Sequence, residues 1–173
     1  MNLIYDKLIN AKAFIFDVDG VMTTGQVLVT EEGMMLRSFN IKDGYAIQHA
    51  VKAGYPICII SGGKSSGITK RFEVLGVKDI YIGQSDKQAA YDEFKTKYNL
   101  ADSDIIYMGD DMPDLPIMKQ VGIACCPADA AVDILQVANY ISPLNGGQGC
   151  VRDILEKTLK LQKLWMNDLS FTW

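Results

Sequence analysis

The sequence predicts an α/β fold with a mostly parallel β-sheet and one small projecting β-hairpin, and two observations support this prediction. Short apolar runs alternate along the chain with amphipathic segments of about ten residues, which is the order of strands joined by helices. Some runs, such as residues 56–60, are apolar throughout, as is typical of parallel strands covered on both faces. The 173 residues fit one domain with a sizeable core, so we expect a single domain over residues 1–173.

The first elements include the one departure from this alternation. A short leading helix is expected within residues 1–12, followed by a first apolar strand at 13–17. Residues 25–29 and 34–39 are strand-like and flank a short polar turn that ends in glycine, which predicts a β-hairpin at about 25–39. Because this hairpin interrupts the alternation, we expect it to project from the main sheet.

Local signals place the remaining elements. Gly54 and Gly76 each follow a segment of helical periodicity and predict where a helix ends, and Pro113 suits the first turn of another helix. The remaining helices are expected at 43–53, 65–75, 86–98, 113–120, 129–136 and 150–164. The remaining strands are expected at 56–60, 80–82 and 104–108, with two short edge strands at 122–124 and 138–141.

Composition and charge narrow the classes of function. Hydrophobic residues make up 49% of the chain and charged residues 22%, which is the balance of an ordinary soluble globular protein. The 17 basic and 21 acidic side chains are scattered, without the basic stripe that nucleic-acid binding requires. No apolar run approaches the ~20 residues of a membrane span. We therefore expect neither nucleic acid nor a membrane as a partner.

The N-terminal residues and the cysteines predict where the protein resides. The first residues lack a basic start followed by an apolar signal region. The four cysteines, Cys58, Cys125, Cys126 and Cys150, form no CxxC pair, and the first of them lies inside an apolar run. Buried free thiols are common in a reducing compartment. These observations favour a cytoplasmic protein without zinc or redox chemistry.

Two carboxylates follow the first strand. Asp17 and Asp19 are two residues apart, so they can point the same way at the end of an extended strand. Two like charges this close are unfavourable unless a cation or a proton lies between them. The pair therefore predicts a metal site at the carboxyl edge of the sheet.

Three later strand ends also carry polar groups. In chain order they are Ser61-Gly62-Gly63-Lys64, Gly83-Gln84-Ser85-Asp86-Lys87 and Gly109-Asp110-Asp111-Met112-Pro113-Asp114. A single aspartate or serine in a loop is usually a cap or a turn residue, and a lone lysine is usually a solvated surface residue. Ligand sites of α/β sheets, however, lie outside the carboxyl ends of the strands. We interpret the whole set as one site.

The chemistry of this set is coherent. Several carboxylates without histidine or thiol ligands select a hard cation, and magnesium fits best. A hydroxyl, a lysine and glycine-flanked backbone amides suit a phosphoryl group. A carboxylate beside a cation can attack phosphorus and form an acyl phosphate. A second carboxylate two residues on can give a proton to the leaving oxygen and later take one from water.

In order along the chain, these residues resemble the four motifs of the haloacid dehalogenase-like phosphatases. The matching segments are Phe16-Asp17-Val18-Asp19-Gly20-Val21, Ile60-Ser61-Gly62, Lys87 and Gly109-Asp110-Asp111-x-x-Asp114. The resemblance covers essentially the whole chain. It implies a Rossmann-like, doubly wound core and a Mg²⁺-dependent phosphomonoester hydrolase that acts through an aspartyl-phosphate intermediate.

The resemblance also implies a role for each motif residue. Asp17 corresponds to the nucleophile and Asp19 to the general acid and base. The phosphoryl group would be bound by Ser61, Gly62 and Lys87. The metal would be held by Asp17, Asp110 and the backbone carbonyl of Asp19, with support from Asp111 and Asp114.

Two features narrow the resemblance to the capless tetrameric branch of the family. No segment between motifs is long enough for a separate cap domain, and the hairpin at about 25–39 is the only extra element. Residues 39–47 and 146–153 also look like that branch. In it, hairpins form a barrel at the centre of a tetramer, and a neighbouring subunit closes each active site. The resemblance therefore implies a homotetramer whose sites are completed by neighbouring subunits.

The branch implies a sugar-acid phosphate as the small-molecule substrate. We expect 3-deoxy-D-manno-octulosonate 8-phosphate, a lipopolysaccharide precursor, and the alternative is a nine-carbon sialic-acid-type 9-phosphate. Gly63 departs from both groups, because the octulosonate enzymes carry arginine after the motif-two Gly and the nine-carbon relatives tend to carry glutamate. The candidate substrate contacts are Lys64, Arg71 and Asp43.

Several alternatives stay open. A phospho-accepting receiver module also places carboxylates, a hydroxyl and a lysine at strand ends, but receivers lack a general acid two positions after the acceptor. A phosphatase-like subunit kept for assembly alone would usually lose the nucleophile.

His49 is expected to be a partly exposed helix residue rather than a catalyst. The aromatic segment 165–173 is compatible with disorder or with packing on a neighbouring subunit.

Overall fold

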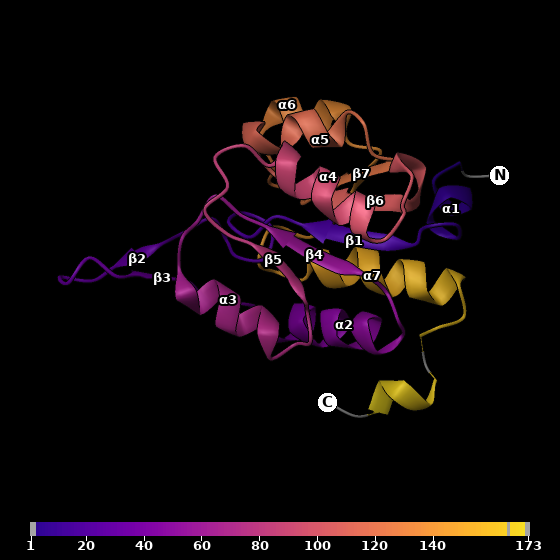
Figure 1. Ribbon diagram of the computed structural model, residues 1–173, viewed down its shortest axis with the longest axis horizontal. Helices are drawn as coiled ribbons and strands as arrows, with labels where there is room; N and C mark the ends of the chain where they lie inside the picture. The colour runs from indigo at the N-terminus through magenta and orange to yellow at the C-terminus, as the bar shows by residue number, and fades with distance from the viewer. Residues whose placement is uncertain (1–2, 166, 172–173) are drawn as a thin grey trace.

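A six-stranded sheet forms the centre of the computed structural model, which describes residues 3–165 and 167–171 (Figure 1). The strand order is β5-β4-β1-β6-β7-β8, and every registered pair in the sheet is parallel. The strands are β1 (Ala13–Phe16), β4 (Ile57–Ile60), β5 (Asp79–Tyr81), β6 (Ile105–Met108), β7 (Ile123–Cys126) and β8 (Tyr140–Ile141). The prediction of an α/β fold with a mostly parallel sheet is thus confirmed.

Helices cover both faces of this sheet (Figure 1). One face packs against α1 (Leu3–Leu8), α2 (Ile41–Lys52), α3 (Ser66–Glu73) and α7 (Cys150–Leu161). The other face packs against α4 (Gln88–Lys97), α5 (Leu115–Met118) and α6 (Val132–Val137). The described part of the chain also contains three 3₁₀ turns, at Asp102–Asp104, Met112–Asp114 and Asp168–Phe171.

The central strand β1 is buried on both of its faces. Phe14 and Phe16 belong to the core beneath α2 and α7, whereas Ala13 and Ile15 belong to the core beneath α4 and α5. This division follows from the two-residue period of a strand, which sends successive side chains to opposite faces. Burying one large apolar side chain contributes about 1.5–3 kcal/mol, so β1 is firmly anchored and so is the loop that follows it.

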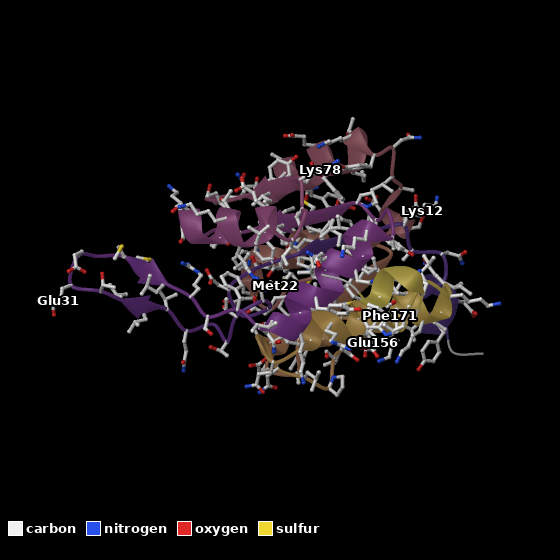
Figure 2. The ribbon with its side chains drawn as sticks, turned by 90° about the horizontal axis from the view of Figure 1, so that it is seen from below. Lys12, Met22, Glu31, Lys78, Glu156 and Phe171 are labelled. Carbon is white, nitrogen blue, oxygen red and sulfur yellow. The ribbon has the colours of Figure 1, made fainter. Side chains whose placement is uncertain are left out.

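The predicted hairpin projects from the body of the molecule. Its strands are β2 (Leu28–Val29) and β3 (Met35–Leu36), an antiparallel pair in a sheet of their own. Figures 1 and 2 show it extending away from the layered core, with Glu31 at its tip. The apolar side chains of the hairpin are exposed, and they are Val27, Leu28, Val29, Met34, Met35 and Leu36.

Two predictions about secondary structure are wrong in detail. Residues 122–124 were expected to form an edge strand, but β7 runs to Cys126 and lies between β6 and β8 inside the sheet. Order along the chain does not fix order in a sheet, because parallel strands are joined by crossovers. The helix expected at 113–120 is a 3₁₀ turn at Met112–Asp114 followed by the short helix α5.

The expectation of buried free thiols is confirmed, since all four cysteines are free and buried. His49 lies in a helix as expected, but its predicted partial exposure is wrong. This side chain is 2% exposed, and its Nε2 lies 2.9 Å from the carbonyl oxygen of Leu164. Trp165 covers the His49 ring edge-on, because the chain after α7 turns back onto α2. Of the aromatic segment, Met166, Thr172 and Trp173 lie outside the described residues.

No helix within the described part of the chain combines the length and the apolar character needed to cross a bilayer.

Candidate active site

A cavity of about 490 Å³ lies at the carboxyl end of the central strands. The loops after β1, β4 and β6 meet here because these three strands are neighbours in the sheet, and the loop after β5 joins them. The cavity is lined by Asp17, Asp19, Gly25, Ser61, Gly62, Gly63, Gln84, Ser85, Lys87, Asp110, Asp111, Pro113 and Asp114. Every residue that the motifs marked as catalytic, phosphate-binding, metal-binding or supporting is in this lining.

Lys87 joins two buried carboxylates at the floor of the cavity. Its Nζ donates to Oδ1 of Asp17 and to Oδ1 of Asp114, each at 2.6 Å. The lysine side chain is only 5% exposed. Burial alone lowers the pKa of a lysine, but the two carboxylates outweigh burial and raise the pKa of Lys87 above its ordinary value. The ammonium group is therefore a fixed positive charge beside Asp17.

Asp114 organises the loop that follows β6. Its Oδ1 accepts a hydrogen bond from the Tyr107 hydroxyl at 2.5 Å, and its Oδ2 accepts one from the backbone N–H of Asp110 at 3.1 Å. Asp111 instead caps the 3₁₀ turn, accepting from the N–H of Met112. A buried carboxylate with this many donors is held in one orientation. Asp114 therefore fixes both Lys87 and the backbone that carries Asp110.

Three carboxylates form a candidate cation site. One carboxylate oxygen from each of Asp17, Asp110 and Asp114 lies within 4.8 Å of the others. Burial, reinforced by the charge of Asp114 and opposed by Lys87, raises the pKa of Asp17 to about 8. Burial and the charges of Asp114 and Asp111 raise the pKa of Asp110 to about 7. These carboxylates need a proton or a cation between them, and a donor set made of oxygen atoms suits Mg²⁺.

The glycine that follows Asp19 in the first motif lets the Asp110 carboxylate lie close to this loop. Gly20 has a φ of +89°, and a Cβ at this position would lie 2.0 Å from Oδ2 of Asp110. A side chain here would be strained and would displace the carboxylate. The glycine that ends Asp-x-Asp-Gly thus makes room for a residue about ninety positions further along the chain.

The loop after β4 forms a second wall of the cavity. Ser61 is buried, and its Oγ accepts from the N–H of Gly63 at 3.1 Å. Gly62 is exposed beside it on the cavity wall. A hydroxyl and glycine amides can together donate hydrogen bonds to phosphoryl oxygens.

Asp19 is paired with a residue that the sequence reasoning missed. Nε of Arg37 donates to Oδ1 of Asp19 at 2.6 Å, and Nη2 donates to Oδ2 at 2.9 Å. Arg37 comes from the second arm of the hairpin and is the one basic residue between positions 25 and 39. That isolated charge in an otherwise apolar and acidic hairpin was the available signal, but the contact itself depends on the direction of the hairpin.

The three candidate substrate contacts are not in the cavity lining. Lys64 is exposed, and its aliphatic stem packs beside Gly83. Asp43 is buried and accepts from the backbone N–H of Arg152 at 2.7 Å, at the start of α7. The guanidinium of Arg71 lies against Gly44 and borders a small hollow together with Asp43. The structure brings the motif residues together and leaves these three outside.

Comparisons with known proteins agree with this geometry. A family model described as haloacid dehalogenase-like hydrolase matches residues 76–154. The 3-deoxy-D-manno-octulosonate 8-phosphate phosphatase KdsC of Yersinia pestis is 35% identical over 159 residues, covering 92% of this chain and 85% of that protein. The KdsC of Escherichia coli K12 is 35% identical over 156 residues, covering 90% and 83%.

Solved structures show the same likeness. The crystal structure of the Yersinia pestis phosphatase has a TM-score of 0.91 and 34% identity, covering 93% of this chain and 87% of that chain. The phosphatase of Moraxella catarrhalis, solved in complex with magnesium, phosphate and KDO, has a TM-score of 0.90 and 34% identity, covering 94% of each chain.

The fold and the carboxylate-rich cavity define a hydrolase of the phosphatase type. This chain belongs to the haloacid dehalogenase-like hydrolases, in the family that includes the 3-deoxy-D-manno-octulosonate 8-phosphate phosphatases.

Proposed function

We propose that this protein is a Mg²⁺-dependent phosphatase that hydrolyses 3-deoxy-D-manno-octulosonate 8-phosphate to the free sugar acid and inorganic phosphate. The observation that carries the proposal is the buried Asp17–Lys87–Asp114 pairing, which lies with Asp110 and Ser61 in one cavity. The relatives named for this reaction, and the Moraxella structure with magnesium, phosphate and KDO, support the choice of substrate and metal.

In the first half of the proposed reaction, an oxygen of Asp17 attacks phosphorus and the bond to the sugar oxygen breaks. Asp19 gives its proton to that leaving oxygen, and the sugar acid departs. Lys87, Ser61 and the backbone amide of Gly62 hold the phosphoryl oxygens during the transfer. The product of this step is an aspartyl phosphate on Asp17.

In the second half, water attacks the phosphorus of the aspartyl phosphate and gives a proton to Asp19. Inorganic phosphate leaves and Asp17 is regenerated, so Asp19 returns to its starting protonation state. Asp17, Asp110 and the backbone carbonyl of Asp19 would hold Mg²⁺, which supplies charge neutralisation at the phosphoryl group. Asp114 and Asp111 support this arrangement, because one orients Lys87 and the other caps the turn that follows Asp110.

The test is phosphate release in the presence of Mg²⁺ from a panel of esters. The panel contains the octulosonate 8-phosphate, a nine-carbon sialic-acid-type 9-phosphate, other sugar phosphates and a nucleoside monophosphate. We expect the highest kcat/KM for the octulosonate ester, and we expect EDTA and the Asp17→Asn substitution each to abolish turnover. Asp133→Asn is the matched control, since Asp133 is an exposed residue in the first turn of α6.

Each other outcome points to a different function. Turnover by the Asp17→Asn protein would exclude the aspartyl-phosphate route. A preference for the nine-carbon ester would favour the alternative substrate, which Gly63 leaves open because it matches neither group of relatives. A stable phospho-aspartate that lasts for minutes would favour a receiver module. Phosphate release no higher than background for every ester would favour a phosphatase-like subunit kept for assembly alone.

We also propose that the protein is a cytoplasmic homotetramer in which neighbouring subunits close the active sites. The exposed apolar hairpin supports the assembly, because apolar side chains grouped on a projecting element mark an interaction surface. A cavity without a cap domain needs another means to exclude water, and a neighbouring subunit can provide it. Four free buried thiols are in keeping with a reducing compartment.

A further inference from the structure

Arg37 occupies both oxygen atoms of the Asp19 carboxylate. The two hydrogen bonds, at 2.6 and 2.9 Å, form the parallel fork that arginine makes with carboxylates. The arginine side chain is 6% exposed and the Asp19 side chain 34% exposed, so the guanidinium is the more enclosed partner. A carboxylate with both oxygens engaged in this way cannot also reach the leaving oxygen of a substrate.

The surroundings hold the guanidinium over the cavity wall. A Cβ at Gly63 would lie 3.0 Å from Nη2 of Arg37 and 3.3 Å from Oδ2 of Asp19, so the absence of a side chain at Gly63 lets the ion pair rest on this loop. Nη1 of Arg37 donates to the carbonyl oxygen of Met35 at 3.3 Å, which ties the arginine to its own hairpin.

Arg37 also borders a second hollow, of about 550 Å³, on the hairpin side. Its other lining residues are Thr24, Gln26, Val27, Leu28, Leu36 and Ser38. Asp19 lines the catalytic cavity and Arg37 lines this second hollow, so the ion pair stands between the two spaces. The organic part of a phosphate ester that extends past Asp19 toward the hairpin therefore meets the guanidinium.

We propose that Arg37 is a specificity-determining residue that exchanges partners, leaving Asp19 for a carboxylate on the substrate. The inference rests on the proposed function, because a sugar-acid phosphate carries both the phosphoryl group and the carboxylate that this exchange requires. The incoming carboxylate replaces the one that Arg37 gives up, and Asp19, freed of the guanidinium, takes up a proton from water and can then give it to the leaving oxygen. A phosphate ester without a carboxylate has to separate the same ion pair without a replacement, so it reacts poorly.

The experiment compares two alkyl phosphate esters in wild type, Arg37→Gln and Arg37→Lys. One ester is the octulosonate 8-phosphate and the other is arabinose 5-phosphate, which has no carboxylate. For Arg37→Gln we expect kcat/KM for the octulosonate ester to fall about 10–100-fold, the value of a hydrogen-bonded ion contact. We expect kcat/KM for the arabinose ester to rise roughly 3-fold, because Asp19 is no longer engaged.

Arg37→Lys keeps the positive charge but cannot form the two parallel hydrogen bonds. Its kcat/KM for each ester is expected to lie between the values of wild type and Arg37→Gln. Arg152→Gln is the matched control, since Arg152 pairs with Glu156 on α7, and it should leave the ratio of the two kcat/KM values unchanged. The thermal midpoint of each variant is measured alongside, so that a folding defect is separated from an effect on specificity.

The results separate this inference from the proposed function. If wild type hydrolyses the octulosonate ester and Arg37→Gln lowers both esters equally, the exchange is overturned while the proposed function stands. If both esters are unaffected by Arg37→Gln, the exchange is also overturned. If wild type hydrolyses the arabinose ester but neither the octulosonate ester nor a nine-carbon acid 9-phosphate, the proposed function fails and the exchange fails with it.

Discussion

The fold raises the pKa values of two carboxyl groups in the site, Asp17 and Asp110. Asp17 is buried and Asp110 is half-buried near Asp114, and the resulting pKa values of about 8 and about 7 lie far above the ordinary value of 3.8. Carboxyl groups with raised pKa values favour the protonated form in the folded protein. Their contribution to stability is complete below about pH 4 and is lost as the pH rises through 7 and 8.

These raised pKa values make the stabilisation of the protein by Mg²⁺ depend on pH. The metal-free protein is expected to lose thermal stability between pH 6 and pH 8, because its clustered carboxyls lose their protons. Mg²⁺ binds the deprotonated carboxylates, so the stabilisation on adding Mg²⁺ should grow with pH, by about 1.4 kcal/mol per pH unit for each proton released. Differential scanning fluorimetry from pH 5.5 to 8.5, with and without Mg²⁺, measures this difference.

The Asp110→Asn variant is the comparison for the series without Mg²⁺, because it removes one of the two titrating groups and should flatten the pH dependence of the metal-free protein's stability. If the stabilisation by Mg²⁺ is constant or declines toward pH 8, the assignment of Asp17, Asp110 and Asp114 as a cation site is contradicted.

Single residues also mark the limits of what the sequence predicted. Asp17, Ser61 and Lys87 could be placed in one site because each lies in a segment that follows a strand. The carboxyl ends of parallel strands share one edge of the sheet, whatever the order of the strands. Arg37 could not be placed, because its contact with Asp19 depends on how the hairpin leaves the sheet. His49 was wrongly expected to be partly exposed, because Trp165 covers it from a segment more than a hundred residues away.

At the scale of elements, the turn between β6 and α5 is a closely packed part of the site. It begins at Gly109, passes through Asp110 and Asp111, and ends at Asp114, whose carboxylate folds back onto the start of the turn. The sequence predicted a full helix from Pro113, but the chain first makes a 3₁₀ turn capped by Asp111. The capped turn brings the Asp114 carboxylate back over the start of the turn. Pro113 by itself could indicate only that a regular helix begins here.

Gly109→Ala is expected to disturb this turn. A Cβ at Gly109 would lie 2.3 Å from Cγ of Asp114, so the carboxylate has to move and its bonds to Lys87 and Tyr107 weaken. We expect a loss of about 1–3 kcal/mol in the free energy of unfolding, measured by urea denaturation, together with a lower kcat.

Gly67→Ala is the matched control, because Gly67 lies in the first turn of α3 and the added Cβ would be 3.4 Å from Oγ of Ser65, the N-cap residue. That variant should be at least as stable as wild type, since alanine favours a helix over glycine. Equal stability of the two alanine variants would show that Asp114 is not held as tightly as its contacts indicate.

At the scale of the whole molecule, the hairpin is the element whose apolar side chains a single chain leaves exposed. Leu28 is 68% exposed and Val29 is 59% exposed on an element that contacts little of the core. Isolated two-stranded hairpins are at best marginally stable in water, so these strands need a partner. The sequence predicted the projection of this hairpin correctly, but its partner is not encoded in any local pattern.

Replacing Leu28 and Met35 by lysine should therefore disrupt the proposed tetramer. The charges would be buried at the centre of the assembly without partners, which is strongly unfavourable. Sedimentation velocity is expected to show a tetramer for wild type and smaller species for the double variant. A Glu31→Gln, Glu32→Gln variant is the control for charge, since it raises the net charge by the same two units and both residues are exposed in the turn between β2 and β3. A wild-type monomer at micromolar concentration would contradict the assembly.

The position of β1 has a consequence for biosynthesis on the ribosome. This strand is made first among those of the sheet, yet Phe14 pairs with Ile57 on one side and with Ile106 on the other. At about 5–20 residues per second, the nascent strand waits several seconds before its second neighbour emerges. Until then four consecutive apolar residues have at least one unpaired edge, where they can be bound by a chaperone or by another nascent chain. The strand that precedes Asp17, the proposed nucleophile, is thus the one that waits longest for its neighbours in the sheet.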